Sequence, residues 1–385
     1  MVSLEMEEIP SVLTGIDVLA RDGFAVLRGA NIGLITNHTG LTRTGVPTVD
    51  LLRATPGVHL KALFSPEHGP LGEADEAFGD STDPATGLPV YSLYGQRAEP
   101  TPEQLAGIDT LVIDLQDIGT RFYTFLSTLG HCLIAAARHR LRVLILDRPN
   151  PIAGVAVEGP LADETRLSFT AFHPIPVRHG MTLGELALLL MAERGLKLDL
   201  IVVKCEGWKR TDWWDATGLL WVNPSPNMRT LAAALLYPGV GLLEFTNVSV
   251  GRGTDTPFEI VGAPYVEGRA LAYIMNAKAL PGIRFVPIRF TPTASIFAGQ
   301  PCGGVRLLIT DRVRFAPVRT GLEIALALRA LHLEEWQASK YLTLLACRTA
   351  MDGILAGEDY TTLEKRWRAD LRGFNQARSH FLLYE

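Results

Sequence analysis

Short hydrophobic runs recur through the first half of the chain and alternate with stretches whose apolar residues follow helical spacing. The runs indicate buried strands, at residues 31–36, 59–65, 110–115, 142–147 and 199–204. The stretches between them indicate helices, at residues 15–27, 48–54, 122–140 and 183–194. Strands and helices that alternate in this way form a parallel sheet covered by helices on both faces. We therefore expect an α/β, Rossmann-like domain with a mostly parallel sheet.

This alternation stops at about residue 239. Later segments indicate strands at 258–260, 283–290 and 305–309 and helices at 318–333 and 361–371, without a regular order. We place a boundary near Tyr237, Pro238 and Gly239. The prediction is an α/β domain over residues 12–238 and a smaller α+β C-terminal domain over residues 239–385.

Polar groups follow several of the predicted strands directly. Glu67 and His68 come after the second strand, and Asp114, Asp117 and Arg121 surround the end of the third. The carboxyl ends of parallel strands lie along one edge of a sheet, so these groups would converge there. This convergence predicts an enzyme active site. The long connector at 71–102 is expected to form a lid or a wall of its cleft.

The composition of the chain argues against some classes of binding partner. The chain has 385 residues, a net charge of -5 and no block of lysine or arginine, which argues against nucleic acid and against a polybasic membrane anchor. No apolar run reaches the roughly 18 to 20 residues of a membrane span. The four cysteines are scattered without zinc spacing, so we expect reduced, mostly buried thiols and no structural metal.

The first ten residues contain three glutamates and lack both a basic start and an apolar core. They do not resemble a signal peptide. We expect a cytoplasmic protein, or an exported one if a signal segment has been removed.

Glu67 is the strongest candidate for a catalytic acid. It stands at a strand-to-loop corner before His68 and Gly69, where its neighbours can raise its pKa; the alternative is that it accepts hydrogen bonds from loop amides. His68 is expected to orient the loop more than to act as a base. Glu244 is a further acid candidate, in a polar loop region that also contains Asn247 and Arg252.

Asp114, Asp117 and Arg121 allow two interpretations. They form either a substrate site or an internal salt-bridge network, since Asp117 stands four residues before Arg121. Tyr123 is as suited to the core as to the cleft. Both interpretations stay open at this level.

Three later residues occupy similar corners. Asn150 belongs to a turn fixed by prolines, whose polar groups either bind a ligand or form hydrogen bonds within the turn. Glu158 precedes a Gly-Pro pair. Arg178 could hold an anionic substrate group, whereas Thr182 and Glu185 form a helix capping box. No GxGxxG, P-loop or GxSxG motif occurs, which argues against dinucleotide, nucleotide and serine-hydrolase chemistry.

Taken together, these motifs resemble one family. The motifs are Asn37-His38-Thr39-Gly40, Ser65-Pro66-Glu67-His68-Gly69, the segment from Asp114 to Thr124, Asp147-Arg148-Pro149-Asn150-Pro151, Glu158-Gly159-Pro160 and Asn223-Pro224-Ser225-Pro226-Asn227. The chain is similar, from about Gly15 onward, to the NamZ-type exo-beta-N-acetylmuramidases. The resemblance implies hydrolysis of non-reducing-end N-acetylmuramic acid from peptidoglycan fragments, in a cleft shared by a Rossmann-like domain and a smaller C-terminal domain, with no metal or nucleotide cofactor.

The expected chemistry is acid-assisted glycoside cleavage. Glu67 is the expected acid, and Glu244 or Asp117 is the second carboxylate, which either activates water or steers the 2-acetamido group of the substrate. Arg121, Arg178 or Arg252 could bind the lactyl carboxylate. The full set of candidate substrate-binding residues is His38, His68, Asp114, Arg121, Tyr123, Asn150, Glu158, Arg178, Asn227, Asn247 and Arg252.

Two other functions are possible from the sequence. A non-catalytic protein that binds muropeptides would use the same cleft, and a metallohydrolase would use His68, His173 and His179, although this spacing matches no common zinc site. The expected partners are peptidoglycan-derived disaccharides or muropeptides. An exposed apolar patch on the C-terminal region would favour a homodimer.

Overall fold

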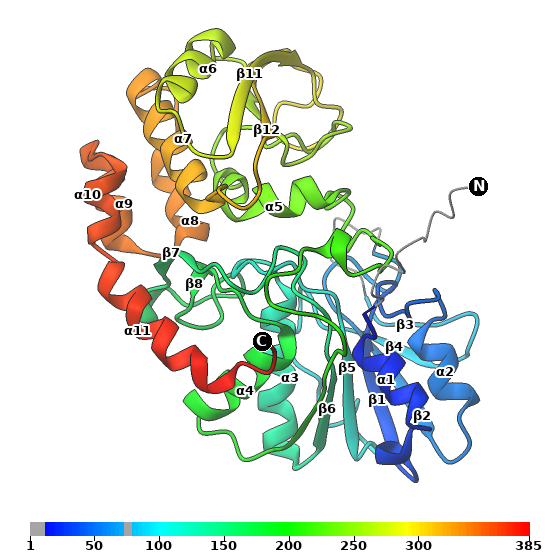
Figure 1. The fold of residues 1–385 in the computed structure, drawn as a ribbon. Coiled ribbons are helices and arrows are strands. Elements are labelled where there is room, and N and C mark those ends of the chain that lie inside the picture. The colour runs from blue at the N-terminus through cyan, green and yellow to red at the C-terminus, as the bar shows by residue number, and fades with distance from the viewer. Residues whose placement is uncertain (1–11, 73–78) are drawn as a thin grey trace, which may run out of the picture.

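The computed structural model describes residues 12–72 and 79–385 and has at its centre a seven-stranded sheet (Figure 1). The strand order is β3-β4-β2-β1-β5-β6-β9, and each neighbouring pair is parallel except β3 and β4. The prediction of a mostly parallel sheet is confirmed. The strands are β1 (Asn31–Thr36), β2 (His59–Ser65), β3 (Ser81–Thr82), β4 (Pro89–Ser92), β5 (Thr110–Asp114), β6 (Arg142–Leu146) and β9 (Asp199–Val203).

Helices cover both faces of this sheet, as expected. Successive residues of a strand point to opposite faces, so Leu34 packs in one core cluster with α1 and α2, whereas Ile35 packs in the other with α3 and α4. Central strands buried on both faces explain why their sequences are continuously hydrophobic. These helices are α1 (Gly15–Arg21), α2 (Thr48–Ala54), α3 (Phe125–His139) and α4 (Leu183–Glu193).

The C-terminal domain contains a three-stranded antiparallel sheet in the order β10-β12-β11. In β11 the buried residues Ile283 and Phe285 alternate with the exposed residues Arg284 and Val286, so one face of this sheet packs inward and the other meets solvent. The elements are α5 (Leu231–Val240), β10 (Ile260–Ala263), α6 (Gly268–Ala277), β11 (Ile283–Phe290), β12 (Cys302–Ile309), α7 (Pro317–Leu331), α8 (Leu342–Leu345), α9 (Arg348–Ala356), α10 (Tyr360–Lys365) and α11 (Arg368–Arg378).

A small second sheet and several short helices complete the two domains. A two-stranded antiparallel sheet pairs β7 with β8 beside the main sheet. The short elements are β7 (Glu158–Leu161), β8 (Pro176–Arg178) and the 3-10 helices η1 (Ala25–Leu27), η2 (Glu164–Arg166), η3 (Trp214–Ala216), η4 (Gly241–Leu243), η5 (Ala338–Tyr341) and η6 (Ser379–Phe381).

Some predicted helices are broken in the structure. The helix expected at 15–27 ends at Arg21, because Gly23 and Phe24 have positive φ angles of 65° and 54°. The helix expected at 361–371 is divided at Trp367 between α10 and α11. The domain boundary at 238/239 stays a prediction; α5 runs through it and accommodates Pro238.

The C-terminal end of the chain returns to the N-terminal domain (Figure 1). The Arg378 guanidinium donates hydrogen bonds to the carbonyls of Gly154 and Gly180. The Tyr384 hydroxyl donates to the buried Asp147 carboxylate at 2.5 Å. The two domains are therefore joined through the last residues as well as through α5.

The cysteines match the expectation of reduced, mostly buried thiols. All four cysteines are unpaired and buried. Within residues 12–72 and 79–385, no helix combines the length and apolar character needed to cross a membrane.

Arg121 is buried to 1% exposure where the domains meet. Its guanidinium donates to the carbonyls of Pro160 and Ile175, both at 3.0 Å, and to those of Leu344 and Leu345 at 2.8 and 2.7 Å. Burial lowers the pKa of the guanidinium to about 10, so it stays charged at neutral pH. One side chain thus binds two distant parts of the chain.

We predict that Arg121→Met destabilises the protein strongly. The substitution leaves four buried carbonyls without their donor, at about 1 kcal/mol each, so the free energy of unfolding should fall by roughly 4 kcal/mol. Urea denaturation measures this change. The matched control is Arg53→Met on the exposed side of α2, which should change the free energy by less than about 0.5 kcal/mol. Equal effects of the two substitutions would contradict the role given to Arg121.

Candidate active site

A cavity of about 610 Å³ lies between the carboxyl edge of the parallel sheet and the C-terminal domain. Loops after β2 and β4 and the segment before α3 form one side, and α5 with the segments that follow it forms the other. The lining residues are Glu67, His68, Tyr94, Gly95, Ala98, Phe122, Tyr123, Thr124, Phe169, Thr170, Ser225, Met228, Tyr237, Glu244, Phe245, Val248, Val250, Arg252, Phe258, Ser295, Ile296 and Leu344.

Glu67 enters the cavity from a tight corner after β2. His68 and Gly69 both have positive φ angles, 72° and 76°, which turn the chain sharply behind the carboxylate. The Thr124 hydroxyl donates a hydrogen bond to Glu67 Oε2 at 2.5 Å. The Tyr94 hydroxyl also donates to Glu67. Two hydroxyl groups therefore fix the orientation of this carboxylate.

Tyr94 stays a hydrogen-bond donor over the whole neutral range. Its partial burial, and then its hydrogen bond to the Glu67 carboxylate, raise the pKa of its hydroxyl to about 12. Thus Tyr94 does not ionise at neutral pH and does not add a second negative charge beside Glu67.

Glu244 supplies a second carboxylate from the C-terminal side. Arg252 donates its Nε–H to Glu244 Oε1 at 2.6 Å, and the Tyr237 hydroxyl lies 3.4 Å from Oε2. Burial raises the pKa of Glu244, Arg252 opposes this rise, and the negative charge of Glu67 adds a smaller contribution to it. The two carboxylates are thus electrostatically coupled inside one cavity.

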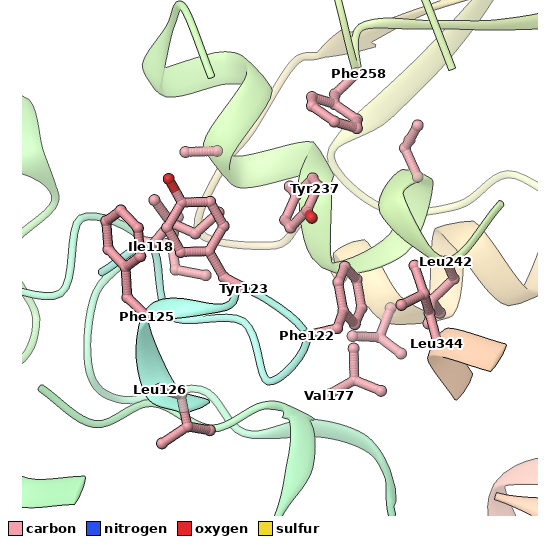
Figure 2. Packing of buried hydrophobic residues seen from close by; sticks show 14 of the residues in the cluster. Ile118, Phe122, Tyr123, Phe125, Leu126, Val177, Tyr237, Leu242, Phe258 and Leu344 are labelled. Atoms are coloured by element: carbon pink, nitrogen blue, oxygen red, sulfur yellow. The ribbon is translucent and has the colours of Figure 1, made fainter. Parts of the chain in front are cut away.

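Four aromatic rings that line the cavity, those of Phe122, Tyr123, Tyr237 and Phe258, lie close together (Figure 2), and we call them the aromatic floor. The Tyr237 ring, on α5, lies 5.0 Å from the Phe122 ring, 6.2 Å from the Tyr123 ring and 4.6 Å from the Phe258 ring, measured between centroids. These contacts join the segment before α3 to the C-terminal domain. The floor of the cavity is therefore continuous with the core that holds the two domains together.

Five of the residues expected from the sequence line the cavity. They are Glu67, His68, Tyr123, Glu244 and Arg252. These five come from four separate segments, which the fold brings to one place.

Arg121 and Asp114 lie outside the cavity, and the expectation that they contact substrate is corrected. The Arg121 guanidinium is occupied by its four carbonyls. The Asp114 carboxylate is fully buried, accepts two hydrogen bonds from Arg148 and accepts a third from Thr48. For these two residues the internal network was the right alternative.

Arg178 and Glu158 also lie elsewhere. They form an ion pair at 2.7 Å, and Arg178 donates in addition to the Ile152 carbonyl at 2.5 Å. Burial raises the pKa of Glu158, and the charge of Arg178 opposes that rise. The pair joins β7 to β8, and neither residue is among those that line the cavity.

Asp117 is buried and accepts a hydrogen bond from the Gly119 backbone N–H at 2.7 Å. Its Oδ2 lies 3.6 Å from His179 Nε2. Asp117 is not part of the cavity lining, so of the two candidates for the second carboxylate only Glu244 faces the cavity.

The remaining candidates are also not among the residues that line the cavity. Asn150 donates to the Met181 carbonyl, and His38 Nε2 lies 2.7 Å from the Asn223 carbonyl. Asn247 donates to the Glu335 carbonyl and accepts from the Gln337 N–H. Asn227 is buried beside the lining residue Met228.

Several lining residues were not identified from the sequence. Thr124 and Tyr94 hold Glu67, Tyr237 contacts Glu244, and Phe169 and Phe245 stand in the wall. The connector at 71–102 is predicted to form a lid or a wall of the cleft, and Tyr94, which belongs to it, lines the cavity. Thr124 is the last residue of the motif that begins at Asp114, whereas no motif or residue spacing in the sequence marks Phe169 as a site residue.

The fold and the cavity define a class. An α/β domain whose sheet edge faces a smaller domain, with two carboxylates in one aromatic-lined cavity, is the arrangement of a glycosidase.

Comparison with known proteins identifies the family. The models of the N-terminal and C-terminal domains of exo-beta-N-acetylmuramidase NamZ match residues 32–232 and 235–384. The chain is 41% identical over 380 residues to the peptidoglycan beta-N-acetylmuramidase NamZ of Bacillus subtilis (strain 168), covering 97% of this chain and 92% of that protein. The chain belongs to the NamZ exo-beta-N-acetylmuramidase family, and the resemblance seen in its motifs is confirmed.

Solved structures support the fold. A DUF1343 family protein from Bacteroides fragilis NCTC 9343 superposes with a TM-score of 0.91 at 35% identity, covering 97% of this chain and 99% of that one. A second DUF1343 family protein of the same strain gives 0.79 at 28% identity with the same coverage. The Rossmann-like domain with a smaller C-terminal domain is therefore confirmed along nearly the whole chain.

We predict that Arg252→Met raises the pKa of Glu244 further. The positive charge of Arg252 is the largest factor that lowers this pKa. Without it, burial and the negative charge of Glu67 should raise the pKa further. NMR titration of glutamate 13Cδ signals, with Glu244 assigned through Glu244→Gln, measures the change. Arg289→Met, at an exposed position on β11, is the control and should leave the titration unchanged. A Glu244 titration that does not move in Arg252→Met would refute the coupling.

Proposed function

We propose that this chain is an exo-acting beta-N-acetylmuramidase that releases non-reducing-end N-acetylmuramic acid from peptidoglycan fragments. The scissile bond is the β-1,4 linkage between N-acetylmuramic acid and N-acetylglucosamine. The observation that carries the proposal is the pair of carboxylates, Glu67 and Glu244, that face one cavity from opposite domains. Family membership supplies the choice of sugar.

Glu67 is the proposed general acid. Cleavage of a glycosidic bond requires a proton for the leaving oxygen and stabilisation of positive charge at the anomeric carbon. The hydroxyls of Thr124 and Tyr94 hold the Glu67 carboxyl in one orientation. A fixed orientation favours proton transfer, because the acid must lie within hydrogen-bond reach of the oxygen that it protonates.

Glu244 is the proposed second carboxylate. It either activates water or steers the 2-acetamido group of the substrate toward the anomeric carbon. Burial raises the pKa of Glu244, and the positive charge of the neighbouring Arg252 limits this rise and so favours the ionised carboxylate. An ionised carboxylate is required in both mechanisms.

Arg252 is the proposed specificity residue. N-acetylmuramic acid differs from N-acetylglucosamine by a lactyl carboxylate, and a planar guanidinium binds such a group well. Of the three arginines considered, Arg252 lines the cavity, whereas Arg121 and Arg178 are engaged in the interior. This contrast favours Arg252.

The proposed substrates are peptidoglycan-derived disaccharides and muropeptides. A cytoplasmic enzyme would meet recycled fragments, and an exported one would meet fragments released from the wall.

We predict that Glu67→Gln removes turnover of the disaccharide while the muramic residue is still bound. Loss of the general acid should lower kcat by about 10²- to 10⁴-fold. An aryl muramide with a strongly acidic leaving group needs less protonation and should retain more activity. Release of N-acetylmuramic acid from both substrates, with and without a chelator, measures this difference.

Glu334→Gln, at an exposed position, is the control and should have full activity. If wild-type protein binds the muramide without cleaving it, the chain is a binding protein. Loss of turnover with chelator would instead indicate a metallohydrolase.

We predict that Arg252→Met lowers the selectivity for muramides over glucosaminides. The ratio of kcat/KM for the two matched aryl glycosides should fall about tenfold, as expected for the loss of one charged hydrogen-bonded contact. A ratio cancels any effect of Arg252 on Glu244 that is common to both substrates. Arg289→Met is again the control, and an unchanged ratio in Arg252→Met would exclude Arg252 as the lactyl-binding residue.

A further inference from the structure

The outer wall of the cavity on the N-terminal side has one feature that the proposed mechanism does not use. Phe169 lines the cavity next to Tyr94, with ring centroids 5.6 Å apart and planes inclined by 53°. Tyr94 in turn donates a hydrogen bond to Glu67. Phe169 is therefore the aromatic ring adjacent to the tyrosine that holds the proposed acid.

The backbone of Phe169 is held firmly for a loop residue. Phe169 and Thr170 form the tip of a tight turn closed by two backbone hydrogen bonds between Ser168 and Ala171, both 3.1 Å. Both tip residues line the cavity. The Ser127 hydroxyl, on α3, donates to the Phe169 carbonyl. The turn is thus anchored to the helix behind it.

The ring of Phe169 is supported as well. The His131 ring, also on α3, stacks on it with 6.1 Å between centroids and 18° between planes. Burial lowers the pKa of His131, so the stacked imidazole is neutral at ordinary pH. A ring backed in this way presents a preformed apolar surface to the cavity, which reduces the entropy lost when a ligand binds.

The position of this surface relative to Glu67 indicates which part of a substrate it meets. The general acid delivers its proton to the oxygen of the leaving sugar, so that sugar lies on the Glu67 side of the bond. Besides Phe122 and Tyr123, which belong to the aromatic floor, the aromatic rings that line the cavity on that side are Tyr94 and Phe169. Glu244 and Arg252 lie across the cavity with Phe258, on the C-terminal domain.

We propose that Phe169, with Tyr94 beside it, forms the subsite for the leaving-group sugar, and that Phe169 is a specificity-determining residue for that sugar. Sugars present an apolar C–H face that packs against an aromatic ring, while a few polar groups orient the hydroxyls. The subsite therefore takes a neutral pyranose such as N-acetylglucosamine. This inference rests on the proposed function.

The test measures binding to each subsite separately in the Glu67→Gln background, where turnover is blocked. Calorimetry compares N-acetylmuramic acid alone with the N-acetylmuramyl-N-acetylglucosamine disaccharide. Phe169→Ala should weaken disaccharide binding by about fivefold to tenfold and leave monosaccharide binding unchanged. Phe169→Tyr should restore disaccharide affinity, and Tyr273→Ala, at a ring that is 79% exposed on α6, should change neither affinity.

Equal loss of affinity for both sugars, or no loss for either, would overturn the assignment of the subsite. Thermal unfolding checks that each variant is folded, and Phe169→Leu replaces Phe169→Ala if the smaller residue destabilises the turn. Failure of the proposed function has a separate signature. In that case wild-type protein would not release N-acetylmuramic acid from either substrate, whatever residue stands at position 169.

Discussion

The buried guanidinium of Arg121 is the interaction on which the site depends. It donates to carbonyls of Pro160 and Ile175 in the N-terminal domain and of Leu344 and Leu345 at α8. A buried charge is costly unless its hydrogen-bonding groups are satisfied, so this network tolerates little displacement of either part. The three residues that follow Arg121 all line the cavity. Their placement is therefore fixed by a side chain that does not itself face the cavity.

The consequence reaches Glu67 through one hydrogen bond. Thr124 stands three residues after Arg121 and donates to Glu67, so the acid is oriented by a segment that the buried arginine anchors. Tyr123, which lies between Arg121 and Thr124 in the sequence, packs against Tyr237, and Tyr237 contacts Glu244. The same short segment thus supports both carboxylates. Support of this kind, from residues behind the reacting groups, keeps a site close to its productive geometry.

The sequence predicted the parallel sheet better than the rest of the fold, for a physical reason. Strands buried on both faces are continuously hydrophobic, whereas β7 and β8 have only 4 and 3 residues and mixed sequences. At the site, Glu67, Glu244 and Arg252 were predicted because charged groups at loop corners are visible in the sequence. The burial of Arg121 and Arg178 is not visible in the sequence, which therefore presents both residues as binding candidates. Tyr94, Thr124 and Phe169 come together only through long-range contacts.

The two carboxylates belong to different domains, and this sets a structural requirement. The distance between the acid and its partner decides how a glycosidase can act, so the domains must keep a fixed relation during the reaction. Arg121 connects the two domains through its hydrogen bonds to α8, and the rings of the aromatic floor connect them through their contacts. The returning C-terminal end adds a third connection, through Arg378 and Tyr384. Each of these connections joins protein groups directly, so the fold itself holds the two carboxylates on one cavity.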